Sequence, residues 1–454
     1  MIRVSNLYLP SRLFVIVAVD GVLLSIAVFL SLGTLSPARA ALVSTLSAAT
    51  LLACFYIFDL YDLDATRKTR DVLLRTLRAL GTGFLLLVPA GATFFLVRPS
   101  YRILEINLLI FLAILCIYRT ASEWLHDWAF PGEKLLLVGS DSSVQLLATA
   151  LKKHLSLPLK LSAIVPERAT DRNGEQAFAM CEDITKIAAL TRTFHPDRVA
   201  ISGFIDSKSP LASELLELRR QGVRIEDAAS LYSTISGRVP VALLDIRRLL
   251  FGKGLADSKS SAVLNDFFGC IFAAVALLLL APTLILIAIL IKLDSRGPVF
   301  YKQERVGLSG RKFLVYKFRS MRQDAEAATG PIWAAAYDRR VTRIGRLLRT
   351  LRLDELPQFI NVLRGEMALV GPRPERPHFV SVLGQQVPYY DLRHSVRPGI
   401  TGWAQVSAGY GATIEEAQEK LEYDLFYILN RSLLLDMLIV VKTGKIMLCG
   451  KGAR

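Results

Sequence analysis

Two adjacent carboxylates, Asp354 and Glu355, lie in a stretch rich in cations and prolines. Downstream, the segment Gly371–Arg376 holds Arg373 and Arg376 among three prolines. Upstream are four evenly spaced arginines: Arg343, Arg346, Arg349 and Arg352. Acids, cations and a nearby apolar segment together indicate phosphate chemistry at a bilayer surface.

The adjacency of the two carboxylates indicates separate roles. Neighbouring side chains on a helix point about 100° apart, so the pair cannot share one proton. One carboxylate would act as a nucleophile and the other as a ligand of a hard cation such as Mg²⁺. The alternative is that Asp354 caps a helix with Pro357 in its first turn. An Asp-Glu pair alone does not decide between the two.

The composition excludes an ordinary soluble enzyme. The 454 residues suffice for two or three domains, and 52% are hydrophobic, with a mean hydropathy of +0.39. The net charge of +15 suits cytoplasmic membrane faces or anionic substrates. Nucleic acid is excluded because the cations alternate with apolar stretches. The five cysteines lack CxxC spacing and the five histidines are dispersed, so no zinc site is predicted.

The N-terminal region, residues 1–130, is predicted to be a four-helix transmembrane bundle. A signal peptide is the competing interpretation of the first segment, but that segment is too long and other apolar segments follow it. Asp20 is expected to pair with a neighbouring helix or lie beside a small residue; an intramembrane function is the alternative. Basic residues place both ends of this region in the cytoplasm. The four apolar segments are 13–32, 40–58, 77–97 and 103–117.

Residues 131–240 are predicted to form a Rossmann-like parallel α/β domain, because strand-like and helix-like segments alternate. The segment Gly139–Ser143 has only one of the glycines of a dinucleotide fingerprint, so a cofactor-free regulatory or assembly domain is favoured. Ser142 is read as a helix N-cap. Residues 241–260 are read as a linker. The predicted strands are 134–138, 159–165, 198–201 and 223–226, and the predicted helices are 142–154 and 210–221.

The apolar segment 267–291 contains Pro282 and is long enough to span a bilayer. However, residues 292–352 hold fifteen Lys or Arg and five Asp or Glu, a strong cytoplasmic signal. A helix-break-helix hairpin that enters and leaves by the same face resolves this conflict, with the break at Pro282.

Beyond this segment, residues 299–302 and 313–318 are expected to form a hairpin around 308–310. Ile344, Leu347, Leu348 and Leu351 recur at helical spacing. They favour a helix at the membrane interface over one that faces the core. Residues 433–441 are too few to span a bilayer and are expected on the domain or the bilayer surface.

From about Asp266 onward, the chain resembles the bacterial sugar transferase family, the monotopic polyprenyl-phosphate phosphoglycosyl transferases. The earlier regions resemble those of the large members that initiate O-antigen, capsule or exopolysaccharide synthesis. The C-terminal region, 261–454, would then be an α-rich catalytic domain with a re-entrant helix. The motifs that carry the resemblance are Ile291–Pro298, Gln303–Gly307, Tyr316–Met321, Leu353–Gln358, Gly371–Pro374 and Arg397–Gln405.

The resemblance implies a reaction in two steps. Asp354 would attack a UDP-sugar and release UMP, and undecaprenyl phosphate would then take the sugar phosphate. Glu355 would hold Mg²⁺ against the diphosphate. Phosphoryl transfer depends on positioning and charge neutralisation, so nearby cations fit it. Lys317, Arg319, Gln358, Arg373 and Arg376 are the candidates for phosphate or nucleotide contacts, and Arg352 for the lipid phosphate.

One departure concerns the start of the membrane hairpin. The family has a Lys-Arg-x-Phe-Asp pattern there, and Ala262–Asp266 keeps only the acid, so Asp266 is expected to lack a basic partner. The expected location is the bacterial inner membrane, with the catalytic domain on the cytoplasmic face; association between copies of the chain stays open. A non-catalytic scaffold and a transporter are the rival classes. The intact acidic pair opposes the first, and the few spans oppose the second.

Overall fold

The computed structural model divides into two compact units, Met1–Arg3 with Tyr8–Leu231 and Val4–Leu7 with Tyr232–Arg454, which are described separately. The structure describes residues 2–4, 7–9, 11–31, 36–62, 69–94, 113–115, 117–118, 132–139, 142–153, 159–165, 179–180, 187–202, 208, 210–244, 259–322, 340–408 and 413–449.

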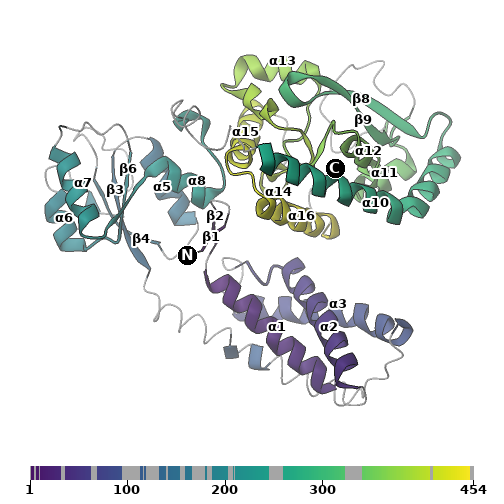
Figure 1. Ribbon diagram of the computed structural model, residues 1–454, viewed down its shortest axis with the longest axis horizontal. Helices are drawn as coiled ribbons and strands as arrows, with labels where there is room; N and C mark the ends of the chain where they lie inside the picture. The colour runs from purple at the N-terminus through teal and green to yellow at the C-terminus, as the bar shows by residue number, and fades with distance from the viewer. Residues whose placement is uncertain are drawn as a thin grey trace. The chain divides into compact units, whose positions relative to one another are not determined.

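The N-terminal region is helical and apolar. Its helices are α1 (Ser11–Ser31), α2 (Pro37–Ile57) and α3 (Thr69–Phe94) (Figure 1), after the short strands β1 (Ile2–Val4) and β2 (Leu7–Leu9). Leu24, Phe55 and Leu80, one from each helix, pack in a shared core. α1 and α2 are long and apolar enough to cross a membrane. The fourth expected segment, 103–117, falls almost wholly outside the described residues.

Asp20 is fully buried, and the Tyr61 hydroxyl donates a hydrogen bond of 3.1 Å to its Oδ2. This partner comes from the turn that follows α2.

The α/β region forms a five-stranded sheet in the order β5-β4-β3-β6-β7, and every neighbouring pair is parallel. This order reverses direction between β3 and β6, as in a doubly wound sheet. The parallel sheet confirms the sequence prediction. Its strands are β3 (Glu133–Val138), β4 (Leu159–Val165), β5 (Ala179–Met180), β6 (Arg198–Ile201) and β7 (Arg224–Asp227); its helices are α5 (Ser142–Lys153), α6 (Ile187–Phe194), α7 (Pro210–Arg220) and α8 (Ala228–Ser236).

The strands are positioned by a buried apolar layer and by the turn after β3. Leu136 and Val199 pack against Leu215 of α7. Gly139 has a φ of 128°, and a Cβ there would lie 2.9 Å from Cβ of Ser202. Ser142, the predicted cap, is the first residue of α5, and the residue before it lies outside the described part of the chain.

The C-terminal unit is built around the long helix α10 (Lys259–Asp294). It is one continuous helix with Pro282 inside it, so the expected separation into two helices is wrong. Proline removes one backbone donor, which can kink a helix without ending it. α10 also begins before residue 267, inside the expected linker, which holds the short turn η2 (Val241–Leu243) as well.

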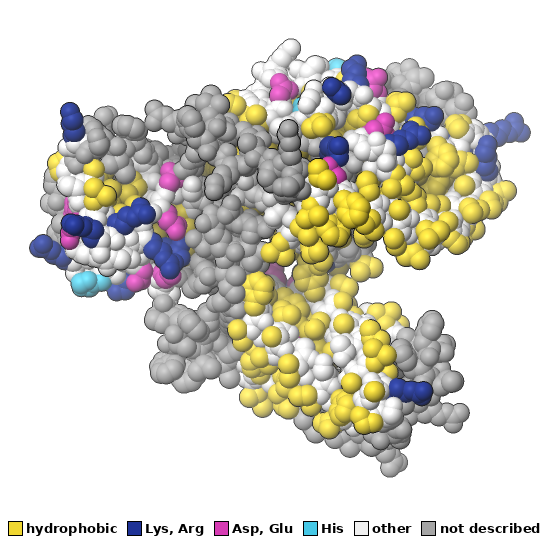
Figure 2. Space-filling view, viewed as in Figure 1, with side chains coloured by type: hydrophobic (Ala, Val, Ile, Leu, Met, Phe, Trp, Pro, Cys, Tyr) yellow, Lys and Arg dark blue, Asp and Glu magenta, His cyan; other side chains and the backbone are white. Residues whose placement is uncertain are grey.

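Residues from both halves of α10 lie in apolar clusters that include a residue of an antiparallel hairpin. The hairpin consists of β8 (Phe300–Val306), the turn η3 (Leu308–Gly310) and β9 (Lys312–Phe318), which confirms the predicted hairpin. Ala273 shares a cluster with Val315 of β9, and Ile287 shares another with Phe318 of the same strand. Other side chains of α10 face outward: Leu278 is 76% exposed and Leu279 72%. Figure 2 shows hydrophobic side chains gathered over this helix.

The remaining elements fold over the hairpin. α11 confirms the helix predicted from the spacing of Ile344–Leu351, and α16 extends seven residues beyond the expected segment. They are α11 (Arg343–Thr350), η4 (Leu353–Glu355), α12 (Gln358–Leu363), β10 (Ala368–Val370), α13 (Pro377–Gln386), η5 (Tyr390–Ser395), β11 (Gly399–Thr401), α14 (Trp403–Ser407), α15 (Ile414–Leu429) and α16 (Leu433–Leu448).

Three glycines let two segments of backbone touch. β10 and β11 pair in parallel, and the Gly371 amide donates to the Thr401 carbonyl at 2.9 Å. A Cβ on Gly371 would lie 2.4 Å from the Arg397 oxygen, and a Cβ on Gly399 would lie 2.1 Å from the Gly371 nitrogen. A Cβ on Gly402 would likewise lie 2.2 Å from the Gly371 oxygen. Only glycine fits this contact, which fixes the start of the Gly371–Pro374 turn.

We expect Gly399→Ala to destabilise the C-terminal unit by about 3 kcal/mol or more, because backbone must move to admit the methyl group. Gly444→Ala is the matched control. A Cβ at Gly444 meets nothing within 4 Å, and alanine favours a helix by about 1 kcal/mol. Melting temperatures of the detergent-solubilised protein measure both variants. Equal melting of Gly399→Ala and wild type would contradict the close contact.

Candidate active site

Asp354 and Glu355 lie in η4, a single turn between α11 and α12. The turn follows Arg352, which adopts a left-handed conformation with φ of 53°. α12 begins after Pro357, and no side chain caps it. Asp354 is therefore not an N-cap, and that alternative is wrong.

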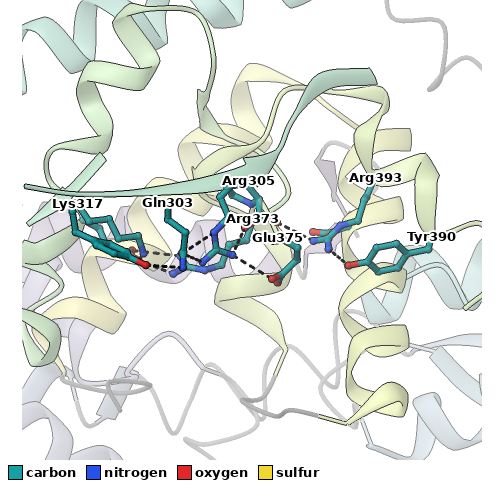
Figure 3. A network of polar contacts seen from close by, with 11 residues as sticks. Gln303, Arg305, Lys317, Arg373, Glu375, Tyr390 and Arg393 are labelled. Carbon is teal, nitrogen blue, oxygen red and sulfur yellow. Dashed lines mark hydrogen bonds and ion pairs between the residues drawn. The ribbon is translucent and has the colours of Figure 1, made fainter. Parts of the chain in front are cut away.

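Glu355 is held by two cations from different parts of the fold. Nζ of Lys317 on β9 lies 2.9 Å from Oε1, and Nη2 of Arg373 lies 2.6 Å from the same oxygen. Arg373 also reaches Oε2 at 3.4 Å. The Glu355 side chain is only 13% exposed, so these ion pairs are poorly screened by water. Figure 3 shows Lys317 and Arg373 in one network of polar contacts.

The two carboxylates titrate differently because their surroundings differ. Burial alone would raise the pKa of Glu355, but Arg373 and Lys317 outweigh it and hold that pKa well below its ordinary value. Burial, followed by the negative charge of Glu355, raises the pKa of Asp354 to about 6. Burial also lowers the pKa of Lys317, with Glu355 opposing the shift. At neutral pH, Glu355 is a fixed anion and Asp354 is an anion that lies close to its protonated form.

A buried amide fixes β9 against α12. Asn361 is fully buried; its Oδ1 accepts from the Tyr316 amide at 3.1 Å, and its Nδ2 donates to the Leu314 carbonyl at 2.7 Å. Nδ2 also donates to Glu366 at 2.7 Å. Since Lys317 follows Tyr316 and the acidic pair precedes α12, Asn361 sets the distance between Lys317 and Glu355.

The turn that carries Arg373 is held by two further arginines. Nη1 of Arg305 on β8 donates to the Pro374 carbonyl at 3.0 Å. Nη2 of Arg393 in η5 donates to the Arg373 carbonyl at 3.1 Å. Figure 3 shows the resulting network, from Lys317 through Arg305 and Arg373 to Arg393 and Tyr390.

The sequence-predicted residues fall into two groups. The structure brings Lys317 and Arg373 onto Glu355, beside Asp354. Burial lowers the pKa of Arg305, and the nearby charge of Arg376 adds to this shift. Gln358 is buried at the start of α12.

The other predicted residues are placed elsewhere. Arg319 is buried, and its Nη2 donates to the carbonyl of Ser295 at 2.7 Å, so it caps the end of α10. Asp266 is paired with Arg397 and Arg431, which corrects the expectation that it lacks a basic partner. Those arginines are distant in sequence, so only the fold reveals them.

Sequence reasoning missed several residues of the site. Burial and Glu355 raise the pKa of Asp354, and Arg349 is among the cations that oppose this rise. The sequence shows Arg349 only as one of four evenly spaced arginines. Arg305 and Arg393 were assigned no role. Arg305 belongs to Gln303–Gly307, one of the motifs that carry the family resemblance, so the sequence did contain a sign of its importance. No motif contains Arg393.

The acidic pair offers oxygen ligands to a metal. Within the described residues, no group of three or more His, Cys, Asp or Glu could hold an ion. Mg²⁺, however, is commonly held by one or two carboxylates together with substrate phosphates. Oε2 of Glu355 accepts only the longer bond from Arg373, and a carboxylate oxygen has two lone pairs, so it retains capacity for a cation.

Comparison with known proteins places the chain in a family. Residues 260–450 match the model of the bacterial sugar transferases. The chain is 43% identical over 189 residues to the exopolysaccharide production protein PSS of Rhizobium leguminosarum bv. phaseoli, which covers 40% of this chain and 93% of the relative. It is 44% identical over 243 residues to the UDP-glucose:undecaprenyl-phosphate glucose-1-phosphate transferase of Caulobacter vibrioides, covering 52% and 83%. The chain belongs to the bacterial sugar transferase family.

A further relative shows the limit of the match. The UDP-N-acetylgalactosamine-undecaprenyl-phosphate N-acetylgalactosaminephosphotransferase of Aeromonas hydrophila is 47% identical over 221 residues, or 49% of this chain. The chain spans about half (51%) of the length of that protein.

We expect Asp354→Asn to raise the melting temperature above pH 6. The folded-state pKa of Asp354 is raised, so ionisation favours unfolding, and the wild type loses stability as pH rises through about 6. The amide removes this penalty, worth on the order of 2 kcal/mol, and the two proteins should melt alike below about pH 4. Melting curves at pH 8 and pH 4 test this. A lower melting temperature for the variant at pH 8 would contradict the raised pKa.

Proposed function

We propose that the protein is an undecaprenyl-phosphate sugar-1-phosphate transferase that initiates exopolysaccharide or a related glycan. The observation that carries the proposal is the buried Glu355, paired with Lys317 and Arg373, beside an Asp354 whose pKa is raised to about 6. That arrangement occurs in a chain of the bacterial sugar transferase family whose relatives are named for this reaction. Phosphoryl transfer uses a nucleophile, cations that neutralise the charge of the phosphate, and a carboxylate that can hold Mg²⁺.

In the first step, an ionised oxygen of Asp354 attacks the phosphorus that carries the sugar. The new bond is an acyl phosphate, and the bond to the bridging oxygen breaks, so UMP leaves with the electron pair. In the second step, an oxygen of the lipid phosphate attacks the same phosphorus. The sugar phosphate moves to the lipid and Asp354 is restored as a carboxylate. Lys317 and Arg373 would stabilise the negative charge that develops on the phosphate oxygens in both steps.

Glu355 would hold Mg²⁺ through Oε2, as the donor set allows. When bound, the ion would neutralise charge on the diphosphate. Lys317 and Arg373 keep Glu355 ionised, which is the form that binds a cation. Gln358 and Arg376 remain candidates for contacts with the nucleotide, and Arg352 for the lipid phosphate.

We propose that α10 is re-entrant and that the domain rests on the cytoplasmic face of the inner membrane. A helix that crossed a bilayer would have its two ends on opposite faces of the membrane, so its two halves could not both pack on one domain. Here Ala273, before Pro282, and Ile287, after it, both pack against β9 or its immediate neighbours. The start is tied down through Asp266 and Arg397, and the end through the Ile344 amide and Asp294.

The assay for the proposed reaction is UMP release from a panel of UDP-sugars with undecaprenyl phosphate and Mg²⁺. We expect Asp354→Asn to lower turnover by at least about a thousandfold, since the nucleophile is lost, and Glu355→Ala by about a hundredfold or more. Asp391→Asn is the control, because that side chain is 87% exposed. Trapping of the sugar phosphate on Asp354 by mass spectrometry supports the covalent step. Normal turnover by Asp354→Asn would refute it, and no release from any UDP-sugar would favour the scaffold.

The membrane arrangement is tested by labelling single cysteines at Ser260→Cys and Ser295→Cys, in a background with the five native cysteines replaced. A membrane-impermeant maleimide should reach both positions from the cytoplasmic side, in inverted vesicles, and neither from the outside. These positions flank the apolar part of α10, so labelling from opposite sides would show that the helix spans the membrane.

A further inference from the structure

The turn that presents Arg373 is built from residues that cannot hold it in place by themselves. Pro372 and Pro374 flank Arg373, and neither has an amide hydrogen to donate. The turn therefore depends on its carbonyls, and four in succession each accept a hydrogen bond from another part of the chain. The donors are the Gly399 amide to Pro372 (3.0 Å), Arg393 to Arg373 (3.1 Å), Arg305 to Pro374 (3.0 Å) and the Val306 amide to Glu375 (2.9 Å).

The two side-chain donors are themselves fixed. Arg305 is 16% exposed; its Nη2 donates to Oε1 of Gln303 at 2.6 Å, and its Nη1 lies 3.4 Å from Glu375. Arg393 is 8% exposed and pairs with Asp424 at 2.9 Å, while its Nη1 donates to the Tyr390 hydroxyl. Each guanidinium thus joins the turn to a second partner, Gln303 for Arg305 and the buried Asp424 for Arg393.

We propose that Arg305 and Arg393 are positioning residues, which hold the successive carbonyls of Pro374 and Arg373 so that Arg373 stays on Glu355. This rests on the proposed function of Asp354 and Glu355. Arg305 and Arg393 contact neither carboxylate through any hydrogen bond that the described residues show, so they act through Arg373. A planar guanidinium can reach three acceptors in fixed directions, which the ammonium of lysine cannot.

The consequence reaches the acidic pair through Arg373. Nη2 of Arg373 lies 2.6 Å from Oε1 of Glu355. If the turn relaxes and Arg373 withdraws, Glu355 loses this ion pair, and the rate should fall as it does when a group of the site is displaced.

The test compares Arg305→Lys and Arg393→Lys with Arg238→Lys. Arg238 is a matched control, because it also donates to a tyrosine hydroxyl, that of Tyr232, and pairs with a carboxylate, that of Glu419. Neither of these partners belongs to the turn. We expect the first two variants to lower kcat about 10- to 100-fold. Arg238→Lys should lower the melting temperature and leave kcat unchanged. A kcat equal to that of the wild type in both turn variants overturns the proposal.

Action through Arg373 is tested by combination. In an Arg373→Met background, Arg305→Lys should reduce kcat no further, because the group that it positions is already gone. A full additional loss would contradict the proposal. If Arg393→Lys does not fold, Tyr390→Phe replaces it, since that change removes one contact of Arg393 without burying an unpaired charge. Its kcat should fall as well, and a kcat equal to that of the wild type counts against the role of Arg393.

A readout that does not need turnover separates this proposal from the proposed function. If the wild type releases no UMP from any UDP-sugar, the proposed function fails. Melting temperatures then decide the positioning role alone. Arg305→Lys and Arg373→Met should be non-additive, whereas Arg238→Lys and Arg373→Met should add. Additive behaviour of the first pair overturns the proposal.

Discussion

The ion pairs of one buried carboxylate organise the C-terminal unit. Glu355 is nearly inaccessible to water, and a buried charge is tolerated only where it is paired and hydrogen-bonded. Its partners come from a strand, Lys317 on β9, and from a turn, Arg373. The fold must therefore bring a hairpin, a helix start and a proline-rich turn to one point. Asn361 joins the hairpin to the helix, and Arg305 joins the hairpin to the turn. The raised pKa of Asp354 follows from the same burial and from the charge beside it.

The site shares its supporting strand with the apolar helix α10. β9 carries Lys317, and its Val315 and Phe318 lie in apolar clusters with residues from the two halves of α10. The ionic contacts of Glu355 and the apolar contacts of α10 therefore meet at one strand, which is why apolar and ionic side chains alternate so closely in this part of the sequence.

The sequence predicted whether a segment is a helix or a strand better than it predicted the contacts between segments. Alternation of strands and helices was enough for the parallel sheet, and the acidic pair with Lys317 and Arg373 could be assembled from motifs. β5, α6 and α8 were not foreseen, since short elements have little periodicity. The segment around Pro282 was expected to be a helix-break-helix hairpin, but α10 continues through the proline as one helix. Partners far apart in sequence were also missed. Nothing near Asp266 indicates Arg397, and nothing near Arg393 indicates Asp424, because such pairs are made only when the chain is folded.

The glycine contact between Gly371 and Gly399 has a consequence for how this protein can diversify. Here two backbones touch without intervening side chains, so the height of the Arg373 turn above the sheet is independent of the size of neighbouring residues. Side chains around the site can then vary in size while the position of Arg373 beside Glu355 stays constant. Relatives named for glucose and for N-acetylgalactosamine resemble this chain to a similar degree. A direct contact between two backbones would let residues around the acidic pair be exchanged without moving the cation that pairs with Glu355.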